Sequence, residues 1–293
     1  MPDFQVFSDS SCDLPPEIVS EFSINLVPYY VSFDGKRYFK ESIEITVSEF
    51  YKQLAENTAF PKTSLPPASD YMNAFRPVLE SGMDILCVCL TEKFSGSFHS
   101  ATTAKSLLEK EYPARRIRVI NSIQATTGQG LVVYEAAKMS KAGIDIEKAA
   151  EALEKLKYSA KLYFTIDSLE HLRRGGRLGL VSVFLGSMLN IKPIIMVTDG
   201  ELKPHSKVRG RKKAIAEVAR LIYEDVKHDI AAYNYIVTQS ESLGDCLYLQ
   251  ELLKSEYGIE IETPAATVGT TIGTHTGASA VGAAYIRKYE RLD

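Results

Sequence analysis

The sequence predicts an α/β protein with two domains, and three observations lead to this fold class. Short apolar runs typical of buried strands alternate with longer segments of helical periodicity. The chain has 293 residues and is 45% hydrophobic, which is enough for a sizeable core and typical of two domains. No Gly/Ser-rich linker separates the halves. We therefore expect a ligand cleft between an N-terminal α/β domain, residues 1–160, and a C-terminal α/β domain, residues 161–293.

In the first half, the patterns predict a largely parallel sheet with helices on both faces, because strands and helices alternate. The aromatic and β-branched runs 24–33 and 36–40 flank an Asp34-Gly35 turn and predict a hairpin. The other predicted strands are 4–7, 84–90 and 117–120, and the predicted helices are 46–55, 69–79, 98–110, 130–141 and 146–158.

The second half is predicted to begin near residue 161 and to continue the alternation. An apolar helix is expected over residues 178–189, and the Ala-rich run 278–289 is expected to close the chain as a helix. The remaining predicted strands are 162–166, 192–197, 202–206, 235–239 and 259–263, and the remaining helices are 212–227 and 243–256.

Composition and missing motifs exclude several classes of function. The net charge of −3 gives no overall attraction to nucleic acid or to anionic membranes. No apolar run approaches the length of a bilayer span and no signal peptide is apparent, so we expect a cytoplasmic protein. Dinucleotide-binding, phosphate-loop and metal-ligand motifs are absent from the sequence. We interpret the four cysteines as free buried thiols: Cys12, Cys87, Cys89 and Cys246.

Three hydroxyl-rich segments form the candidate binding site. Thr63-Ser64 lies between prolines, and Ser95-Gly96-Ser97 follows a predicted buried strand, where open α/β sheets bind ligands. The third segment, Thr274-His275, lies in a Gly/Thr-rich stretch, and a helix beginning near Gly277 would add its positive end. Hydroxyls and an imidazole suit an anion. Each segment alone also fits a turn or a helix cap.

Two other functions remain open on the residues alone. Ser95 or Ser97 paired with His275 would suit an acyl hydrolase acting on lipid esters, although no acidic partner can be named. Basic clusters at 173–177 and 203–213 fit a solvated surface. They also fit a docking surface for an acidic partner or, around Lys207 to Lys213, a site for a phosphorylated ligand.

Seven short motifs occur in order along nearly the whole chain. They are Asp9-Ser10-Ser11-Cys12-Asp13-Leu14, Thr63-Ser64-x-Pro66, Ser95-Gly96-Ser97, Arg174-Gly175-Gly176-Arg177, Leu189-Asn190-Ile191-Lys192-Pro193, Lys207-x-Arg209 and Gly273-Thr274-His275-x-Gly277. Together they resemble the DegV family, which includes the fatty-acid-binding subunits of bacterial fatty acid kinase.

The resemblance implies a DegV-like fold with a long-chain fatty acid lying between the two domains. By motif, Thr63, Ser95 and His275 would hold the carboxylate, with Ser64, Gly96 and Thr274 beside them and Arg209 as an electrostatic support. The acyl chain would be lined in part by Val183, Leu185, Leu189 and Ile191.

The resemblance also implies a carrier and no catalytic residues in this chain. We expect no cofactor apart from the bound fatty acid, and we expect a separate ATP-dependent fatty acid kinase subunit to form the acyl phosphate. Nucleic acid and stable membrane insertion are not expected, whereas transient membrane contact stays open. The sequence departs from the family at Asn121-Ser122, at Thr91-Glu92-Lys93 and at Ala278, which affects pocket geometry and chain preference.

Overall fold

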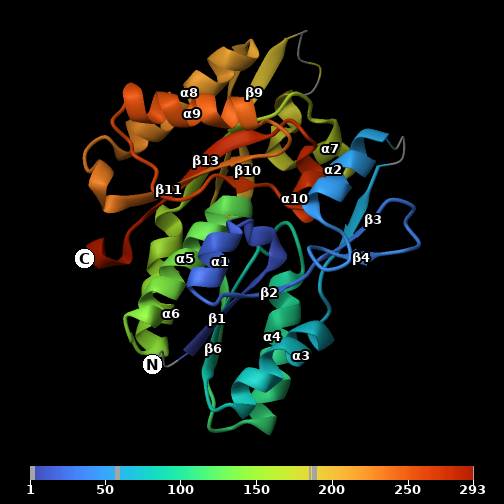
Figure 1. Cartoon of the computed structure of the whole chain (residues 1–293), viewed down its shortest axis with the longest axis vertical. Helices are drawn as coiled ribbons and strands as arrows, with labels where there is room; N and C mark the ends of the chain where they lie inside the picture. The colour runs from blue at the N-terminus through green and yellow to red at the C-terminus, as the bar shows by residue number, and fades with distance from the viewer. Residues whose placement is uncertain (1–3, 57–59, 185, 187–189, 293) are drawn as a thin grey trace.

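The chain folds into two larger sheets, which lie one above the other in the view of Figure 1, and a third, small sheet. This computed structural model describes residues 4–56, 60–184, 186 and 190–292. Within those residues, no helix combines the length and the apolar character needed to cross a bilayer.

The first sheet contains four parallel strands in the order β2-β1-β6-β7. Alternate side chains of β1 and β6 enter different hydrophobic clusters, so both faces of the sheet are covered. One face packs against α3 and α4, and the other packs against α5 and α6. This confirms the predicted parallel sheet with helices on both faces. The bounds are β1 Phe4–Asp9, β2 Asn25–Val27, β6 Asp84–Cys89, β7 Ile117–Asn121, α1 Pro16–Glu21, α3 Ala68–Glu80, α4 Ser97–Glu111, α5 Thr126–Lys141 and α6 Ile146–Leu156.

A small antiparallel sheet of three strands, in the order β4-β3-β5, projects to one side together with α2. The hairpin predicted from the runs 24–33 and 36–40 is confirmed for β3 and β4, which pair antiparallel. The first part of the 24–33 run forms β2, which pairs with β1 in the first sheet. The bounds are β3 Tyr30–Ser32, β4 Phe39–Lys40, β5 Lys62–Ser64 and α2 Val47–Glu56.

The second sheet has six strands in the order β10-β9-β8-β13-β11-β12 and is antiparallel apart from the β11–β12 pair. Helices α8 and α9 cover its outer face, and α5 packs against the inner face. The bounds are β8 Lys161–Thr165, β9 Ile191–Thr198, β10 Glu201–Arg209, β11 Tyr233–Gln239, β12 Ala266–Thr267, β13 Val281–Arg287, α7 Glu170–Arg174, α8 Arg211–Val226, α9 Leu243–Ser255 and α10 Thr270–Thr276.

Two predictions for the second half are wrong, and a third falls only in part on the described residues. In place of the helix predicted over 278–289, residues Val281–Arg287 form the buried strand β13, and the helix next to Gly277 is α10, which ends there instead of beginning there. The apolar segment 178–189 contains a 3-10 helix at Gly179–Phe184, and part of it lies outside the described residues. Residues 259–263 carry no strand. Short Ala- and Gly-rich runs suit both a helix and a crowded strand, so periodicity alone does not separate them.

A single hydrophobic cluster joins the two sheets. It contains Phe4 and Leu86 from the first sheet, Leu131 from α5, and Phe164 and Ala284 from the second sheet. The buried carboxylate of Glu135 on α5 adds polar contacts across the same boundary. It accepts hydrogen bonds from Asn234 Nδ2 at 2.5 Å and from the Tyr289 N–H at 2.7 Å. The boundary predicted at residue 160 stays a prediction, although the two sheets do fall on either side of it.

Candidate functional site

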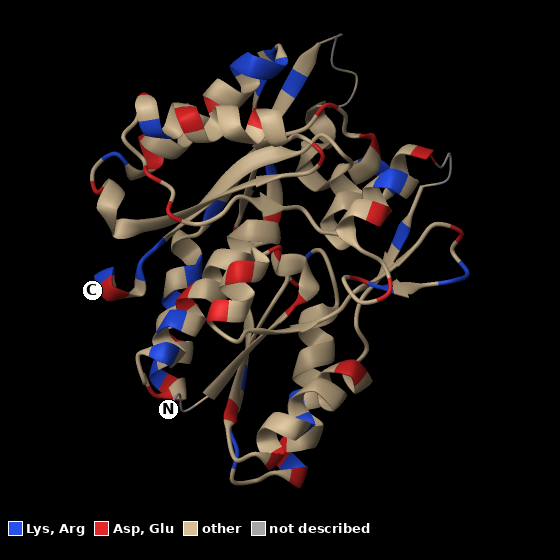
Figure 2. Ribbon diagram, in the orientation of Figure 1, with Lys and Arg blue, Asp and Glu red and all other residues tan. Residues whose placement is uncertain are grey.

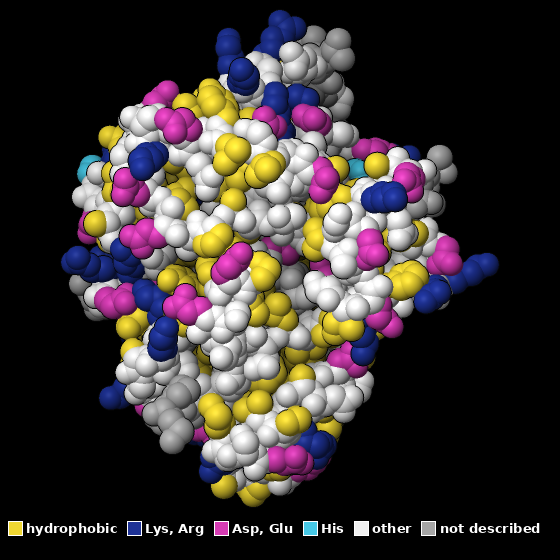
Figure 3. Space-filling view, in the orientation of Figure 1, with side chains coloured by type: hydrophobic (Ala, Val, Ile, Leu, Met, Phe, Trp, Pro, Cys, Tyr) yellow, Lys and Arg dark blue, Asp and Glu magenta, His cyan; other side chains and the backbone are white. Residues whose placement is uncertain are grey.

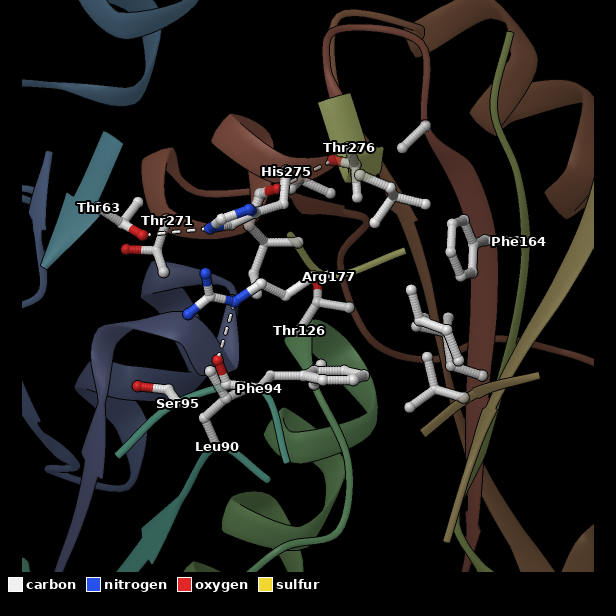
Figure 4. Close-up of a pocket in the computed structure, with 18 of the residues that line it drawn as sticks. Thr63, Leu90, Phe94, Ser95, Thr126, Phe164, Arg177, Thr271, His275 and Thr276 are labelled. Carbon is white, nitrogen blue, oxygen red and sulfur yellow. Dashed lines mark hydrogen bonds between the residues drawn. The ribbon is translucent and has the colours of Figure 1, made fainter. Parts of the chain in front are cut away.

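A cavity of about 230 Å³ lies between the two sheets and is lined by residues of both halves of the chain (Figure 4). From the first half come the segments that follow β6 and β7, represented by Leu90 and Thr126. From the second half come the inner face of the six-stranded sheet, represented by Phe164, and the helix α10. The cavity therefore lies at the carboxyl ends of the parallel strands, where α/β sheets place their ligands.

A buried carboxylate at the end of β1 fixes the loops that carry the polar groups. Asp9 is fully buried and its Oδ2 accepts hydrogen bonds from the Leu90 N–H at 3.0 Å and from Ser97 Oγ at 2.8 Å. Its Oδ1 accepts from Ser11 Oγ at 2.6 Å and from Gln129 Nε2 at 2.9 Å. These charge-assisted bonds hold the end of β6 and the start of α4 in place beside the cavity.

The polar end of the cavity brings together hydroxyls and an imidazole from three distant segments. Thr63 Oγ1 on β5 lies 3.1 Å from His275 Nε2 in the last turn of α10. Ser95 Oγ accepts a hydrogen bond from the Tyr29 hydroxyl at 2.7 Å, which leaves the Ser95 proton available to a ligand. Ser64 also lines the cavity.

Arg177 supplies a positive charge to this end. Figure 4 shows its guanidinium between the Thr63–His275 pair and Ser95. Arg177 Nε donates to the Phe94 carbonyl at 3.1 Å, and Nη1 donates to the Gly175 carbonyl at 2.8 Å. These two hydrogen bonds hold the side chain in place. The side chain is otherwise exposed, so the polar end lies close to the surface.

His275 is neutral at physiological pH. Burial, with smaller contributions from the neighbouring Arg177 and His171, lowers the pKa of its imidazole to about 4. Its Nδ1 is buried without a hydrogen-bond partner among the described residues. A Cβ on Gly175 would lie 2.1 Å from that nitrogen, so the glycine permits the imidazole to pack directly against the chain at this position.

The rest of the cavity is predominantly apolar. Its walls are formed by Leu65, Leu90, Phe94, Ala125, Leu162, Phe164, Leu172, Val197, Leu202, Val268, Ile272, Ala280 and Val281. An apolar space with hydrogen-bond donors and one cation at a single end suits an amphiphilic anion.

The structure brings four of the predicted carboxylate ligands to this cavity: Thr63, Ser64, Ser95 and His275. Gly96 and Thr274 are adjacent in sequence but do not line it. Gly96 precedes α4 and faces the Leu65 side chain, and the Thr274 hydroxyl donates to the Thr270 carbonyl at 2.8 Å.

The structure places the other predicted site residues away from this cavity. Arg209 is exposed at the end of β10, Val183 is 67% exposed, and Ile191 is half-buried at the start of β9. Leu185 and Leu189 lie outside the described residues. None of the described three is a lining residue.

Sequence reasoning missed Arg177 and Tyr29 as members of the polar end. Arg177 belongs to the Arg174-Gly175-Gly176-Arg177 motif, but a cation after a short helix also suits the negative end of that helix. Tyr29 lies in an aromatic run with no distinguishing signal.

The second basic cluster is remote from this chemistry. Figure 2 shows it around the start of α8, at the top of the view. Part of its charge is already neutralised, because Arg211 pairs with Asp245 at 2.8 Å and with Asp167 at 3.6 Å.

Comparisons with known proteins agree with this geometry. A family model described as "Uncharacterised protein, DegV family" matches residues 3–288. A DegV domain-containing protein of Clostridium perfringens is 32% identical over 282 residues, which cover 94% of this chain and 95% of that protein.

Two solved structures extend the likeness to three dimensions. A stearic-acid-binding protein from Eubacterium ventriosum has a TM-score of 0.94 at 32% identity and covers 99% of this chain and 100% of its own. A fatty-acid-binding DegV family protein from Thermus thermophilus has a TM-score of 0.88 at 28% identity, covering 98% and 100%. The match of the family model over nearly the whole chain, together with these likenesses, confirms the resemblance seen in the motifs: the chain belongs to the DegV family.

Proposed function

We propose that this protein binds a long-chain fatty acid in the cavity between its two sheets, with the carboxylate at the polar end. The observation that carries the proposal is the division of one cavity into an apolar body and an end with hydroxyls, a neutral imidazole and a guanidinium. Stearic acid and other fatty acids are bound by structural relatives of similar fold, which supports this ligand class.

The energetics favour such a ligand. Each buried methylene contributes roughly 0.8 kcal/mol, so a chain of about sixteen carbons gains on the order of 12 kcal/mol before the costs of binding. A buried carboxylate requires charge-assisted partners, since an unpaired anion is very costly to desolvate. The hydroxyls of Thr63, Ser64 and Ser95 provide donors, and Arg177 provides the balancing charge.

We further propose that the protein acts in the cytoplasm as a carrier without catalytic residues of its own, and needs no cofactor. A separate ATP-dependent fatty acid kinase would use the bound carboxylate as nucleophile. A carboxylate oxygen would form a bond to the γ-phosphorus of ATP and ADP would leave, giving an acyl phosphate. The exposed basic segment Arg173–Arg177, which adjoins the polar end, is the docking surface that we propose for this partner.

The first test is denaturing organic extraction of the purified protein followed by mass spectrometry. We expect a free fatty acid at close to one mole per mole of protein, and its mass reports the chain preference. An empty protein that also fails to take up added fatty acid would contradict the proposal.

The kinase partner is tested by adding ATP and host extract to the protein loaded with radiolabelled fatty acid. We expect labelled acyl phosphate to form, and we expect its formation to fall in the Arg173→Glu/Arg174→Glu variant. Arg220→Glu is the matched control, because Arg220 is another exposed arginine paired with a nearby glutamate. Retained fatty acid with no acyl phosphate would contradict the kinase step alone.

An acyl hydrolase remains the second candidate because Ser95 and His275 line one cavity. Their nearest polar partners differ, since Ser95 contacts Tyr29 and His275 contacts Thr63. A hydrolase would release fatty acid from a lipid ester, and Ser95→Ala and His275→Ala would each abolish turnover. A carrier shows no turnover in the wild type.

A phosphorylated ligand at Lys207 to Lys213 is the third candidate. Such binding would be weakened by salt and would not depend on acyl chain length.

A further inference from the structure

A further cavity, of about 260 Å³, lies beside the cavity between the two sheets. We call the cavity between the sheets the first cavity and this neighbour the side cavity. The two share the lining residues Phe94, Arg177 and Leu202, which therefore form the wall between them. A hollow with acidic side chains, near the middle of the face shown in Figure 3, differs in this respect. Its described lining has no residue in common with the first cavity.

An aromatic ring and a leucine side chain form the apolar part of this wall. Figure 4 shows the Phe94 ring extending beneath Arg177, away from the polar end and toward the side of the first cavity where Phe164 lies. Leu202 on β10 is buried and meets both cavities from the second half of the chain. The ring is therefore the part of the wall that the first half of the chain contributes.

Contacts with the second half of the chain hold the segment that carries this ring. Thr91 Oγ1 donates to the Gly200 carbonyl at 3.2 Å, and Lys93 pairs with Glu201 at 3.1 Å. The side chain of Phe94 also packs against the hydrophobic cluster that joins the two sheets. Because the segment is attached both before and at the residue next to the ring, the wall has a fixed position.

The side cavity leads from the wall to the surface of the molecule. Leu180 in its lining is 55% exposed, and the side chains of Lys93 and Glu201 are 48% and 41% exposed. Since Lys93 and Glu201 pair with each other, their charges offset and their stems add apolar surface. An acyl chain that passed the wall would therefore meet apolar surface and then open space.

The position of this wall bears on the length of the ligand. Each additional buried methylene raises affinity roughly fourfold, whereas a methylene without room forces strain on the packing around it. The first cavity measures about 230 Å³ and the side cavity about 260 Å³. Removal of the ring would therefore roughly double the space that a chain can enter.

We infer that Phe94 determines the longest acyl chain that the protein accepts, because its ring closes the first cavity against the side cavity. The inference rests on the proposed binding of a fatty acid and adds the size limit of that ligand class. A chain that fits on the near side of the ring is bound. A longer chain is excluded until a smaller side chain at this position lets it turn into the side cavity.

The test is competition among saturated fatty acids from myristic to behenic acid. Delipidated protein is incubated with an equimolar mixture, isolated again and extracted for mass spectrometry. We expect the occupancy of the wild type to fall sharply above one chain length. Phe94→Ala should raise this limit by about two carbons or more, and should raise the ratio of bound behenic to bound palmitic acid at least tenfold.

The matched control is Phe98→Ala. Phe98 is another half-buried phenylalanine, on the neighbouring helix α4, and it packs in a different cluster and lines neither cavity. It should keep the length limit of the wild type. Phe94→Leu keeps an apolar side chain in the wall and covers the case in which Phe94→Ala does not fold. We expect it to shift the limit in the same direction by a smaller amount.

The outcomes separate this inference from the proposed function. A wild type that takes up none of the fatty acids would contradict the proposed function and the inference with it. A wild type that binds them with the same length limit as Phe94→Ala and Phe94→Leu would overturn the inference alone. A shift of equal size in Phe98→Ala would also overturn it, because that variant leaves the wall intact.

Discussion

At the scale of single residues, the state of His275 decides which charge the cavity between the two sheets offers to a ligand. The imidazole stays neutral in the folded protein down to about pH 4. It is therefore a hydrogen-bonding group, and Arg177 is the cation of the site. This assignment has a measurable consequence for stability.

Acidification should destabilise the lipid-free protein through His275. In the unfolded chain the imidazole takes up a proton near pH 6.5, whereas in the folded protein it does so near pH 4. Below about pH 6.5 the unfolded state thus binds an extra proton, and stability is lost progressively down to about pH 4. The loss between pH 6.5 and pH 5 is on the order of 2 kcal/mol. Urea unfolding at pH 6.5 and pH 5 measures the free energy of unfolding. Between these pH values, His275→Gln should lose less of it than the wild type, by about this amount.

The control for this measurement is His99→Gln, because the His99 side chain is 67% exposed. It should lose as much stability on acidification as the wild type. If His275→Gln also behaves like the wild type, the low pKa of His275 is wrong.

Removal of one hydroxyl should weaken fatty-acid retention without affecting the fold. Thr63→Val keeps the shape of the side chain and removes the group that contacts His275 and, in our proposal, the carboxylate. A hydrogen bond to a charged group contributes about 1.5–3 kcal/mol, so we expect roughly tenfold to hundredfold weaker binding. Displacement of a fluorescent fatty acid measures it. Thr103→Val, on the exposed side of α4, should match the wild type, and equal retention in both variants would remove Thr63 from the site.

Sequence patterns located the hydroxyls better than they located the cation. Ser95 follows a predicted strand, His275 lies in a Gly/Thr-rich segment and Thr63 lies between prolines, which are local patterns that point to ligands. Arg177 and Arg209 both lie in basic motifs, and only the packing of the chain after α7 brings Arg177 to the cavity. Long-range placement of a flexible side chain has no local signature.

At the scale of elements, the interpretation of β13 shows why a buried strand can resemble a helix. The segment is rich in alanine and glycine, which periodicity assigned to a helix. In the structure it is a central strand between β8 and β11. Small side chains are needed there because the neighbouring strands and helices pack closely on both faces.

A methyl group at one position of β13 should therefore be destabilising. A Cβ on Gly282 would lie 2.3 Å from the Tyr163 carbonyl oxygen and 2.6 Å from Phe164 Cβ. We expect Gly282→Ala to lower the free energy of unfolding by about 2–3 kcal/mol in urea denaturation. Gly244→Ala in α9 is the matched control, since nothing lies within 4 Å of its Cβ, and it should stabilise by up to about 1 kcal/mol. An unchanged free energy of unfolding in Gly282→Ala would show that β13 can shift to accommodate the methyl group.

At the scale of the whole molecule, the shared core predicts that the two halves unfold together. One hydrophobic cluster contains residues from Phe4 to Ile286, and Glu135 links α5 to β11 and to the end of the chain. The sequence predicts two domains from length and hydrophobic content, and neither quantity gives the area that the two halves share.

Tryptophan reporters can test this cooperativity, because the chain contains no tryptophan. Tyr112→Trp reports on the first sheet and Tyr257→Trp on the second, since each tyrosine packs at the edge of the corresponding cluster. We expect each variant to show a single urea transition by tryptophan fluorescence. In each variant its midpoint should coincide with the midpoint measured by circular dichroism. Separate midpoints within either variant would establish two independent folding units.

Helix α10 is held by the first half of the chain at both of its ends. Asp13 and Glu41 accept hydrogen bonds from the backbone at its beginning, and His275 in its last turn contacts Thr63. A shift of the helix at one end therefore reaches the other, and thermodynamic linkage makes the coupling mutual. Seven residues thus connect the polar end of the cavity to a pair of buried acids.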